Sequence, residues 1–239
     1  MKKLAAALAL SLLPLAFAAQ AEITTTDVVG RKVTVPDVPK RVVLGFYYED
    51  YLAIAGPGSL DRVVGLSLTT WKDWRPKQFA AYEKALPKLK TLPDVGSTDD
   101  NTFSIEKLIA TKPDLLILAT FSYEALGESV KQIEAAGIPV LVLDYLSQTV
   151  DKHVASTLAL GKIMGQEKRA QELADNYRKA FEDIDARIKK AGPTKKKVYF
   201  ELAQKGASEV GNSYGNSMWG ALITQLGGHN IAEGQVGNW

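Results

Sequence analysis

Large aromatic side chains follow the predicted β-strands of this 239-residue chain. In an open α/β sheet, ligands bind outside the carboxyl ends of the strands. Rings with a guanidinium beside them suit a large, flat, partly anionic ligand, through stacking, hydroxyl hydrogen bonds and charge pairing. We therefore predict a binding rim here, with the alternative that each ring merely closes the top of the core. The predicted ligand-binding residues are Tyr47, Tyr48, Trp71, Trp74, Arg75, Tyr123, Tyr145, Tyr214, Trp219 and Trp239.

The chain offers little for catalysis. Neither His153 nor His229 has an acid or nucleophile at the spacing of a known catalytic motif, and no nucleotide-binding glycine motif occurs. We interpret both as surface or helix-end residues and predict no enzyme activity. A metal held by the protein alone usually needs several His or Cys ligands close together, so we predict none. This argument is strong against zinc and weaker against ferric iron, which carboxylates and tyrosines can hold.

The first 21 residues have the pattern of a signal peptide. Lys2 and Lys3 precede an apolar run over residues 4–18, and Ala19-Gln20-Ala21 is an A-x-A cleavage site. We expect export to the periplasm and cleavage after Ala21. Because the sequence contains no cysteine, we expect no lipoprotein anchor, disulfide or thiolate metal site.

Charge gives no sign of a polyanionic partner. The formal net charge of +2 equals the contribution of Lys2 and Lys3, so the remaining chain is balanced. A balanced surface does not favour nucleic acid binding. We expect a monomer, and outside the signal peptide no segment is long and apolar enough to cross a membrane.

Strands and helices alternate over residues 41–148, which predicts a doubly wound N-terminal α/β lobe. The strands are apolar runs such as Leu115-Leu116-Ile117-Leu118, typical of a parallel sheet covered on both faces. An extended lead-in over residues 22–40, with a turn at Gly30-Arg31, precedes the lobe. The predicted strands are 41–45, 63–66, 115–119 and 139–144, and the predicted helices are 49–55, 77–85, 104–111 and 124–136.

A helical connector over residues 149–192 contains helices 150–164 and 167–191. In the second, apolar residues recur every three or four positions, and Gly192 and Pro193 end it. At 1.5 Å per residue it would be roughly 37 Å long, enough to join two lobes. Beyond it, a strand at 198–202 and a helix at 218–226 begin a C-terminal α/β lobe over residues 193–239. One strand and one helix cannot bury a parallel-sheet core, so we expect this lobe to be incomplete or the sequence to be a fragment.

Several short motifs, in this order, resemble one family: the periplasmic binding proteins that deliver iron-siderophore complexes, haem or vitamin B12 to ABC importers. The resemblance implies two α/β lobes bridged by one rigid helix, a ligand held without a covalent bond, and an inner-membrane ABC permease as partner. Members continue through a second lobe about as large as the first. The motifs include Asp27-Val28-Val29-Gly30-Arg31, Arg62-Val63-Val64-Gly65, Ser104-Ile105-Glu106-Lys107-Leu108, Lys112-Pro113-Asp114-Leu115, Gly137-Ile138-Pro139-Val140 and Leu226-Gly227-Gly228-His229-Asn230-Ile231.

The resemblance also assigns Glu106 to docking on arginines of the permease. Glu106 should point outward, since we expect the apolar Ile105, Leu108 and Ile109 to face inward. The alternative is an ordinary helix-start acid, stabilised by the helix dipole and with Ser104 as the cap.

One departure from the family pattern narrows the range of candidate ligands. Haem binders tend to have Gly-Tyr after a Pro-Asp/Val turn, whereas here Ser97 follows Pro93-Asp94-Val95-Gly96. Haem is thereby disfavoured, although Tyr47 or Tyr48 could take over. A ferric siderophore is the first choice, with haem, cobalamin or another metal chelate as alternatives. A periplasmic enzyme on the same fold and a purely structural domain are the other classes.

Overall fold

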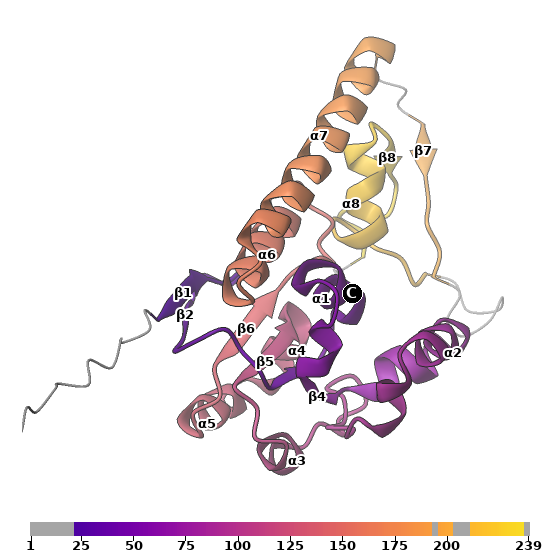
Figure 1. Cartoon of the computed structure of the whole chain (residues 1–239). Helices are drawn as coiled ribbons and strands as arrows, with labels where there is room; N and C mark the ends of the chain where they lie inside the picture. Colours follow the sequence, from indigo (N-terminus) through magenta and orange to yellow (C-terminus); the bar gives the residue numbers. More distant parts are fainter. Residues whose placement is uncertain (1–21, 193–195, 203–210, 237–239) are drawn as a thin grey trace, which may run out of the picture.

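Four parallel strands form the central sheet of the protein (Figure 1). The computed structural model describes residues 22–192, 196–202 and 211–236. The order across the sheet is β4-β3-β5-β6, so the chain moves from β3 to one side and then to the other. The bounds are β3 Val42–Leu44, β4 Val63–Leu66, β5 Leu115–Ala119 and β6 Val140–Leu143.

Alternate residues of each strand enter two separate hydrophobic cores. Leu44, Ile117 and Leu143 belong to one core, and Val43 and Val142 belong to the other. Period-two alternation of a strand places neighbouring side chains on opposite faces, so a sheet covered on both sides needs apolar residues throughout. The predicted doubly wound α/β lobe is confirmed.

Most helices agree with the predicted positions, but one does not. The predicted single helix over residues 124–136 is wrong, because the chain forms α4 and α5, which are separated at Gly127. Gly127 has a φ of 49°, a conformation that ends α4 and that glycine adopts readily. The helices are α1 Tyr48–Ala55, α2 Pro76–Ala85, α3 Ile105–Ala110, α4 Thr120–Leu126, α5 Ser129–Ala135, α6 Val150–Ile163, α7 Glu167–Ala191 and α8 Met218–Gln225, with shorter turns η1 Ser59–Arg62, η2 Thr69–Asp73 and η3 Pro87–Thr91.

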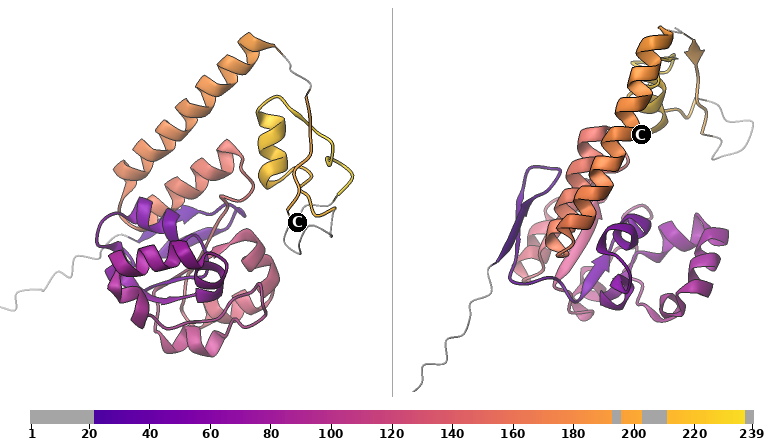
Figure 2. Two further views of the ribbon diagram at one scale, coloured as in Figure 1. Left: turned by 90° about the vertical axis from the view of Figure 1, so that its right-hand side faces the viewer. Right: turned by 45° about the horizontal axis from the view of Figure 1, so that its top comes forward.

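Helix α7 has the predicted bounds and extends well beyond the sheet (Figure 2). Its first half packs closely on α6, where a Cβ placed on Gly161 would lie 2.1 Å from the Cβ of Ala170. Glycine at this point allows the two helices to approach. Farther along, Arg187 forms an exposed ion pair with Asp183 at 2.7 Å. None of the helices in the described ranges combines the length and the apolar character that a membrane span needs.

The described C-terminal residues meet the distal end of α7 and run back from its tip toward the N-terminal lobe (Figure 2). Strands β7 Lys197–Val198 and β8 His229–Asn230 pair in parallel, and α8 packs on β8. The predicted strand over 198–202 is wrong in extent, because ladder pairing ends at Val198. A Cβ on Gly227 would lie 3.1 Å from Cγ2 of Ile188, which places the end of α7 against this unit.

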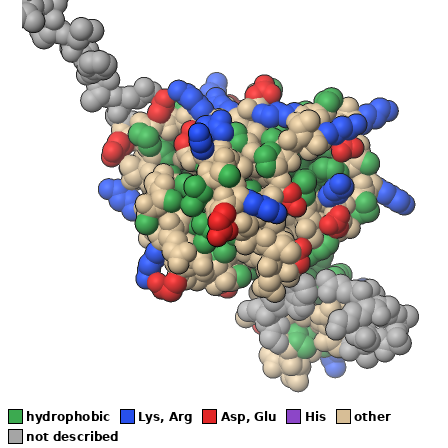
Figure 3. Space-filling model, turned by 90° about the horizontal axis from the view of Figure 1, so that it is seen from below, with side chains coloured by type: hydrophobic (Ala, Val, Ile, Leu, Met, Phe, Trp, Pro, Cys, Tyr) green, Lys and Arg blue, Asp and Glu red, His purple; other side chains and the backbone are tan. Residues whose placement is uncertain are grey.

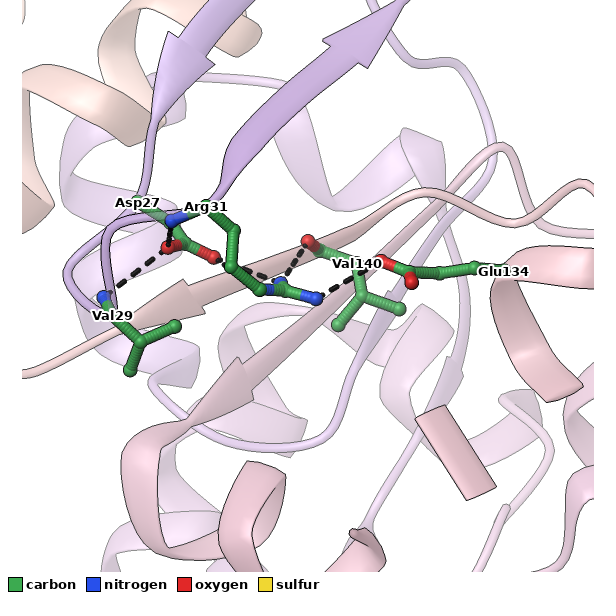
Figure 4. A network of polar contacts seen from close by, with 5 residues as sticks. All are labelled: Asp27, Val29, Arg31, Glu134 and Val140. Atoms are coloured by element: carbon green, nitrogen blue, oxygen red, sulfur yellow. Dashed lines mark hydrogen bonds and ion pairs between the residues drawn. The ribbon is translucent and has the colours of Figure 1, made fainter. Parts of the chain in front are cut away.

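The N-terminal hairpin, β1 Ile23–Thr26 and β2 Lys32–Val35, is fastened to the lobe by Arg31 (Figure 4). The Arg31 guanidinium donates to Asp27 Oδ2 at 2.8 Å, to the Val140 carbonyl at 2.7 Å and to Glu134 Oε1 at 2.9 Å. The side chain of Asp27 is fully buried, and its Oδ1 also accepts from the backbone N–H of Val29. A buried carboxylate of this kind depends on its cation.

We expect Arg31→Ala to lower the free energy of unfolding by about 2 kcal/mol or more, because it leaves the buried Asp27 carboxylate without its cation. Urea unfolding would measure the loss. Arg187→Ala is the matched control, since its ion pair is exposed and such pairs contribute less than about 1 kcal/mol. Equal, small losses in both variants would show that the hairpin does not depend on Arg31.

Candidate ligand-binding site

A pocket of about 270 Å³ lies at the carboxyl ends of the parallel strands. Its wall includes residues that follow three strands: Tyr47 after β3, Thr70 after β4 and Tyr145 after β6. The strand order reverses between β3 and β5, and the rings of Phe46 and Phe121 meet across that point at 5.1 Å. A switch point of this kind leaves a crevice in which ligands of open α/β sheets bind.

A row of aromatic rings forms one wall of the pocket. Tyr47 meets Tyr145 edge to face, with ring centroids 5.0 Å apart. Tyr145 meets His153 of α6 in the same way at 4.7 Å, and His153 stacks on Tyr177 of α7 at 3.7 Å. The long helix therefore contributes directly to the pocket.

Tyr47 has an unusual backbone conformation at the base of the pocket. Its φ of 58° and ψ of 47° are left-handed, which is uncommon for a bulky residue. Its hydroxyl accepts from the backbone N–H of Tyr145 at 3.1 Å, which holds the ring in place. This residue turns the chain from β3 into α1, whose first turn carries Glu49 and Asp50 into the pocket wall.

Tyr48 and Trp71 pack together behind the wall. Their rings are parallel at 4.6 Å, and the Tyr48 hydroxyl bonds to the Ser67 carbonyl and to Thr70. Tyr48 still reaches the pocket lining, whereas Trp71, which is 1% exposed, packs against Phe79 in the core. For Trp71 the structure therefore matches the alternative in which a ring closes the core.

The charged residues of the lining are Glu49, Asp50 and Arg75. Arg75 Nη1 lies 3.8 Å from Glu49 Oε1, and the Arg75 side chain is 54% exposed. Burial, with a smaller effect of the neighbouring Glu49 charge, raises the pKa of Asp50 to about 6. Burial also lowers the pKa of His153 to about 4, so this ring is neutral at pH 7. Carboxylates thus outnumber cations in the lining at neutral pH.

The other predicted ligand-binding residues lie away from this pocket. Trp74 is 53% exposed and does not line the pocket, and Tyr123 lies on the opposite face of the sheet, against Arg31. Tyr214 and Trp219 belong to the C-terminal unit, where both contact Phe200. Trp239 lies outside the described residues.

The predicted ligand-binding residues did not include eight residues of the lining, among them Glu49, Asp50, His153 and Tyr177. His153 does lie at a helix end, in the first turn of α6, but it is partly buried between two rings rather than on the surface. The signal for Tyr177 was its place in the apolar stripe of α7. Glu49 and Asp50 carried no signal in the sequence, because carboxylates are common in the first turn of any helix.

The pocket is not an evident metal centre. Within the described ranges, no three His, Cys, Asp or Glu side chains lie close enough together to hold a metal ion. Rings and carboxylates around a crevice suit an organic ligand with a polar group that fixes its orientation.

Glu106 lies outside the pocket, exposed in the first turn of α3. Ser104 is the predicted N-cap, accepting from Lys107 N, and its hydroxyl donates to Glu106 Oε2 at 2.9 Å. The hydrogen bonds from the Glu106 backbone N–H and from Ser104 lower the pKa of Glu106. The expectation that Ile109 faces inward is wrong, since it is 43% exposed. Figure 3 shows the face of the lobe that lies opposite the tip of α7. Acidic and basic side chains are interspersed over this face.

A doubly wound lobe with a switch-point pocket, joined by one long helix to further α/β elements, has the architecture of an extracytoplasmic ligand-binding protein. Residues 42–239 match the family described as periplasmic binding protein, and the chain belongs to that family. The structure resembles the TroA-like periplasmic binding protein FepB of Veillonella parvula, with a TM-score of 0.79 and 30% identity, covering 90% of this chain and 64% of that one.

Two curated relatives are named for different ligands. The iron(3+)-hydroxamate-binding protein YxeB of Bacillus subtilis strain 168 is 29% identical over 82% of this chain and 53% of its own length. The molybdate-binding protein MolA of Haemophilus influenzae Rd is 33% identical over 54% of this chain and 34% of its own length. The chain thus spans about half the length, or less, of the curated relatives it matches.

We expect Asp50→Asn to stabilise the protein at pH 7 by about 1 to 3 kcal/mol, because it removes a carboxylate that is ionised in a desolvated place. The folded-state pKa of Asp50, about 6, lies above the ordinary value of 3.8. Its contribution to stability is therefore greatest below about pH 4 and is lost as the pH rises through 6. Urea unfolding at pH 4 and pH 7 would measure the difference from wild type.

The exposed Asp61→Asn serves as the control and should show no such gain. A gain from Asp50→Asn of the same size at both pH values would contradict the assignment of Asp50 as a desolvated acid.

Proposed function

We propose that this protein captures a ferric siderophore in the periplasm and delivers it to an inner-membrane ABC permease. The segment over residues 1–21 directs its export and is cleaved after Ala21, and the protein works as a monomer with no enzyme activity. The observation that carries the proposal is the aromatic pocket at the switch point of the sheet, closed on one side by α7. The ligand is bound without a covalent bond.

Three observations favour a siderophore over haem and molybdate. The hydroxyls of Tyr47 and Tyr48 are buried and already hydrogen bonded, which argues against either as a ligand of haem iron. Among the described residues, Arg75 is the only cation of the lining, and Glu49 already lies beside it, so a bare oxyanion such as the molybdate of MolA finds little positive charge there. The relationship to the hydroxamate-binding YxeB points in the same direction.

Titration of the full-length protein with four ligands tests the proposal: a ferric hydroxamate, haem, cobalamin and molybdate. Quenching of tryptophan fluorescence, checked by calorimetry, gives the affinities. Saturable binding of the ferric hydroxamate with the highest affinity is expected. Tighter binding of haem, cobalamin or molybdate would replace the siderophore as ligand, and no binding of any would favour a structural domain.

We expect Tyr177→Ala to weaken ferric hydroxamate binding about 3- to 10-fold, because an aromatic contact contributes on the order of 1 kcal/mol beyond its burial. Leu173→Ala, one turn earlier on α7 and outside the pocket, should leave the affinity unchanged. Calorimetry on both variants would measure the difference. An unchanged affinity in Tyr177→Ala would remove α7 from the site.

We expect Glu106→Ala to lower uptake of the ferric chelate into cells while leaving its affinity for the purified protein intact, because interfacial charges mainly set encounter and register. Glu172→Ala, which removes an exposed acid from α7, is the control and should transport normally. Normal uptake by Glu106→Ala at both low and physiological salt would leave Glu106 as a helix-start acid only.

A further inference from the structure

Asp50 differs from the other charged residues of the pocket because it has no partner of opposite charge. Among the described residues, the ion pairs include Glu49 with Arg75 but none with Asp50. Asp50 is half-buried at the start of α1, and its carboxylate interacts with its own backbone N–H, so water compensates its charge only in part. A carboxylate buried to this degree is normally also paired with a cation.

The surroundings of Asp50 would attract a cation. Arg75 is 54% exposed and lies beside Glu49, and its charge lowers the pKa of Asp50 less than burial and the Glu49 charge raise it, while the His153 ring is neutral at pH 7. The pocket therefore has an uncompensated negative charge next to the rings of Tyr47, Tyr145 and Tyr177. A carboxylate forms charge-assisted hydrogen bonds with an ammonium group, and aromatic faces attract the same group.

The size of the pocket limits what it can hold. A volume of about 270 Å³ is below the range of roughly 300 to 1,000 Å³ that is usual for drug-sized ligands. A whole siderophore complex is larger than that, so this pocket fits one part of it. A pendant group can enter while the metal and its chelating groups stay above the rim.

We propose that Asp50 binds a protonated amine or amidinium group on the ligand, so that the substrate is a metal chelate with a cationic arm. This inference rests on the proposed function and narrows its substrate class. It also gives a physical basis for discrimination, because a wholly anionic chelate would bring like charge against Asp50 and Glu49.

The test compares two ferric trihydroxamates that differ by one charge: ferrioxamine B, which ends in a primary amine, and its N-acetyl derivative. Calorimetry at pH 7 on the full-length protein should show that ferrioxamine B binds at least about tenfold more tightly, as a charge-assisted hydrogen bond would provide. Asp50→Asn should abolish this preference. Asp73→Asn, an exposed acid of η2 outside the pocket, should retain it. Circular dichroism would verify that both variants fold.

The outcomes separate the two proposals. Equal affinity of wild type for both chelates, tighter binding of the acetylated form, or a preference that survives in Asp50→Asn would each overturn the role of Asp50 and leave a siderophore-binding function standing. Failure of both ferrioxamines to bind, together with saturable binding of haem, cobalamin or molybdate, would overturn the siderophore itself.

Discussion

The side chain of Tyr145 joins the parallel sheet to both long helices. It meets Tyr47 at the end of β3 and His153 on α6, and its hydroxyl lies 3.3 Å from Thr157 Oγ1 on α6. Through His153 the same row of rings reaches Tyr177 on α7. Together with the close packing of α6 on α7 at Gly161 and Ala170, these ring contacts set where α7 lies relative to the strand ends. The shape of the pocket follows from that placement.

The fold could be predicted wherever one physical pattern decided the outcome. The strand over 115–119 is apolar throughout because both its faces are covered, and the helix over 167–191 shows a clear amphipathic period. Hydrophobic periodicity did not predict the element bounds where local backbone geometry or a distant strand partner determined them. Gly127 divides a helix without disturbing its hydrophobic residues, and β7 pairs only as far as β8 allows.

The candidate site was predicted as a region but not as a set of contacts. Parallel strands must bring their carboxyl ends to one edge, so Tyr47 and Tyr145 could be assigned to it from the chain order alone. Which rings face the pocket depends on packing that periodicity does not encode. Trp71 turns into the core while its near neighbour Trp74 is exposed, although both follow the same strand. Asp50 became visible only when its burial and lack of a cation could be seen.

Helix α7 fixes the rotation of the C-terminal unit relative to the pocket. Tyr177 lines the pocket and Ile188 meets the C-terminal unit, roughly three helical turns apart and therefore on nearly the same face. One inserted residue between them would rotate the distal unit by about 100° around the helix axis and shift it by about 1.5 Å. Insertions or deletions in this segment therefore preserve the relative orientation of the two parts only when their length is close to a whole number of helical turns.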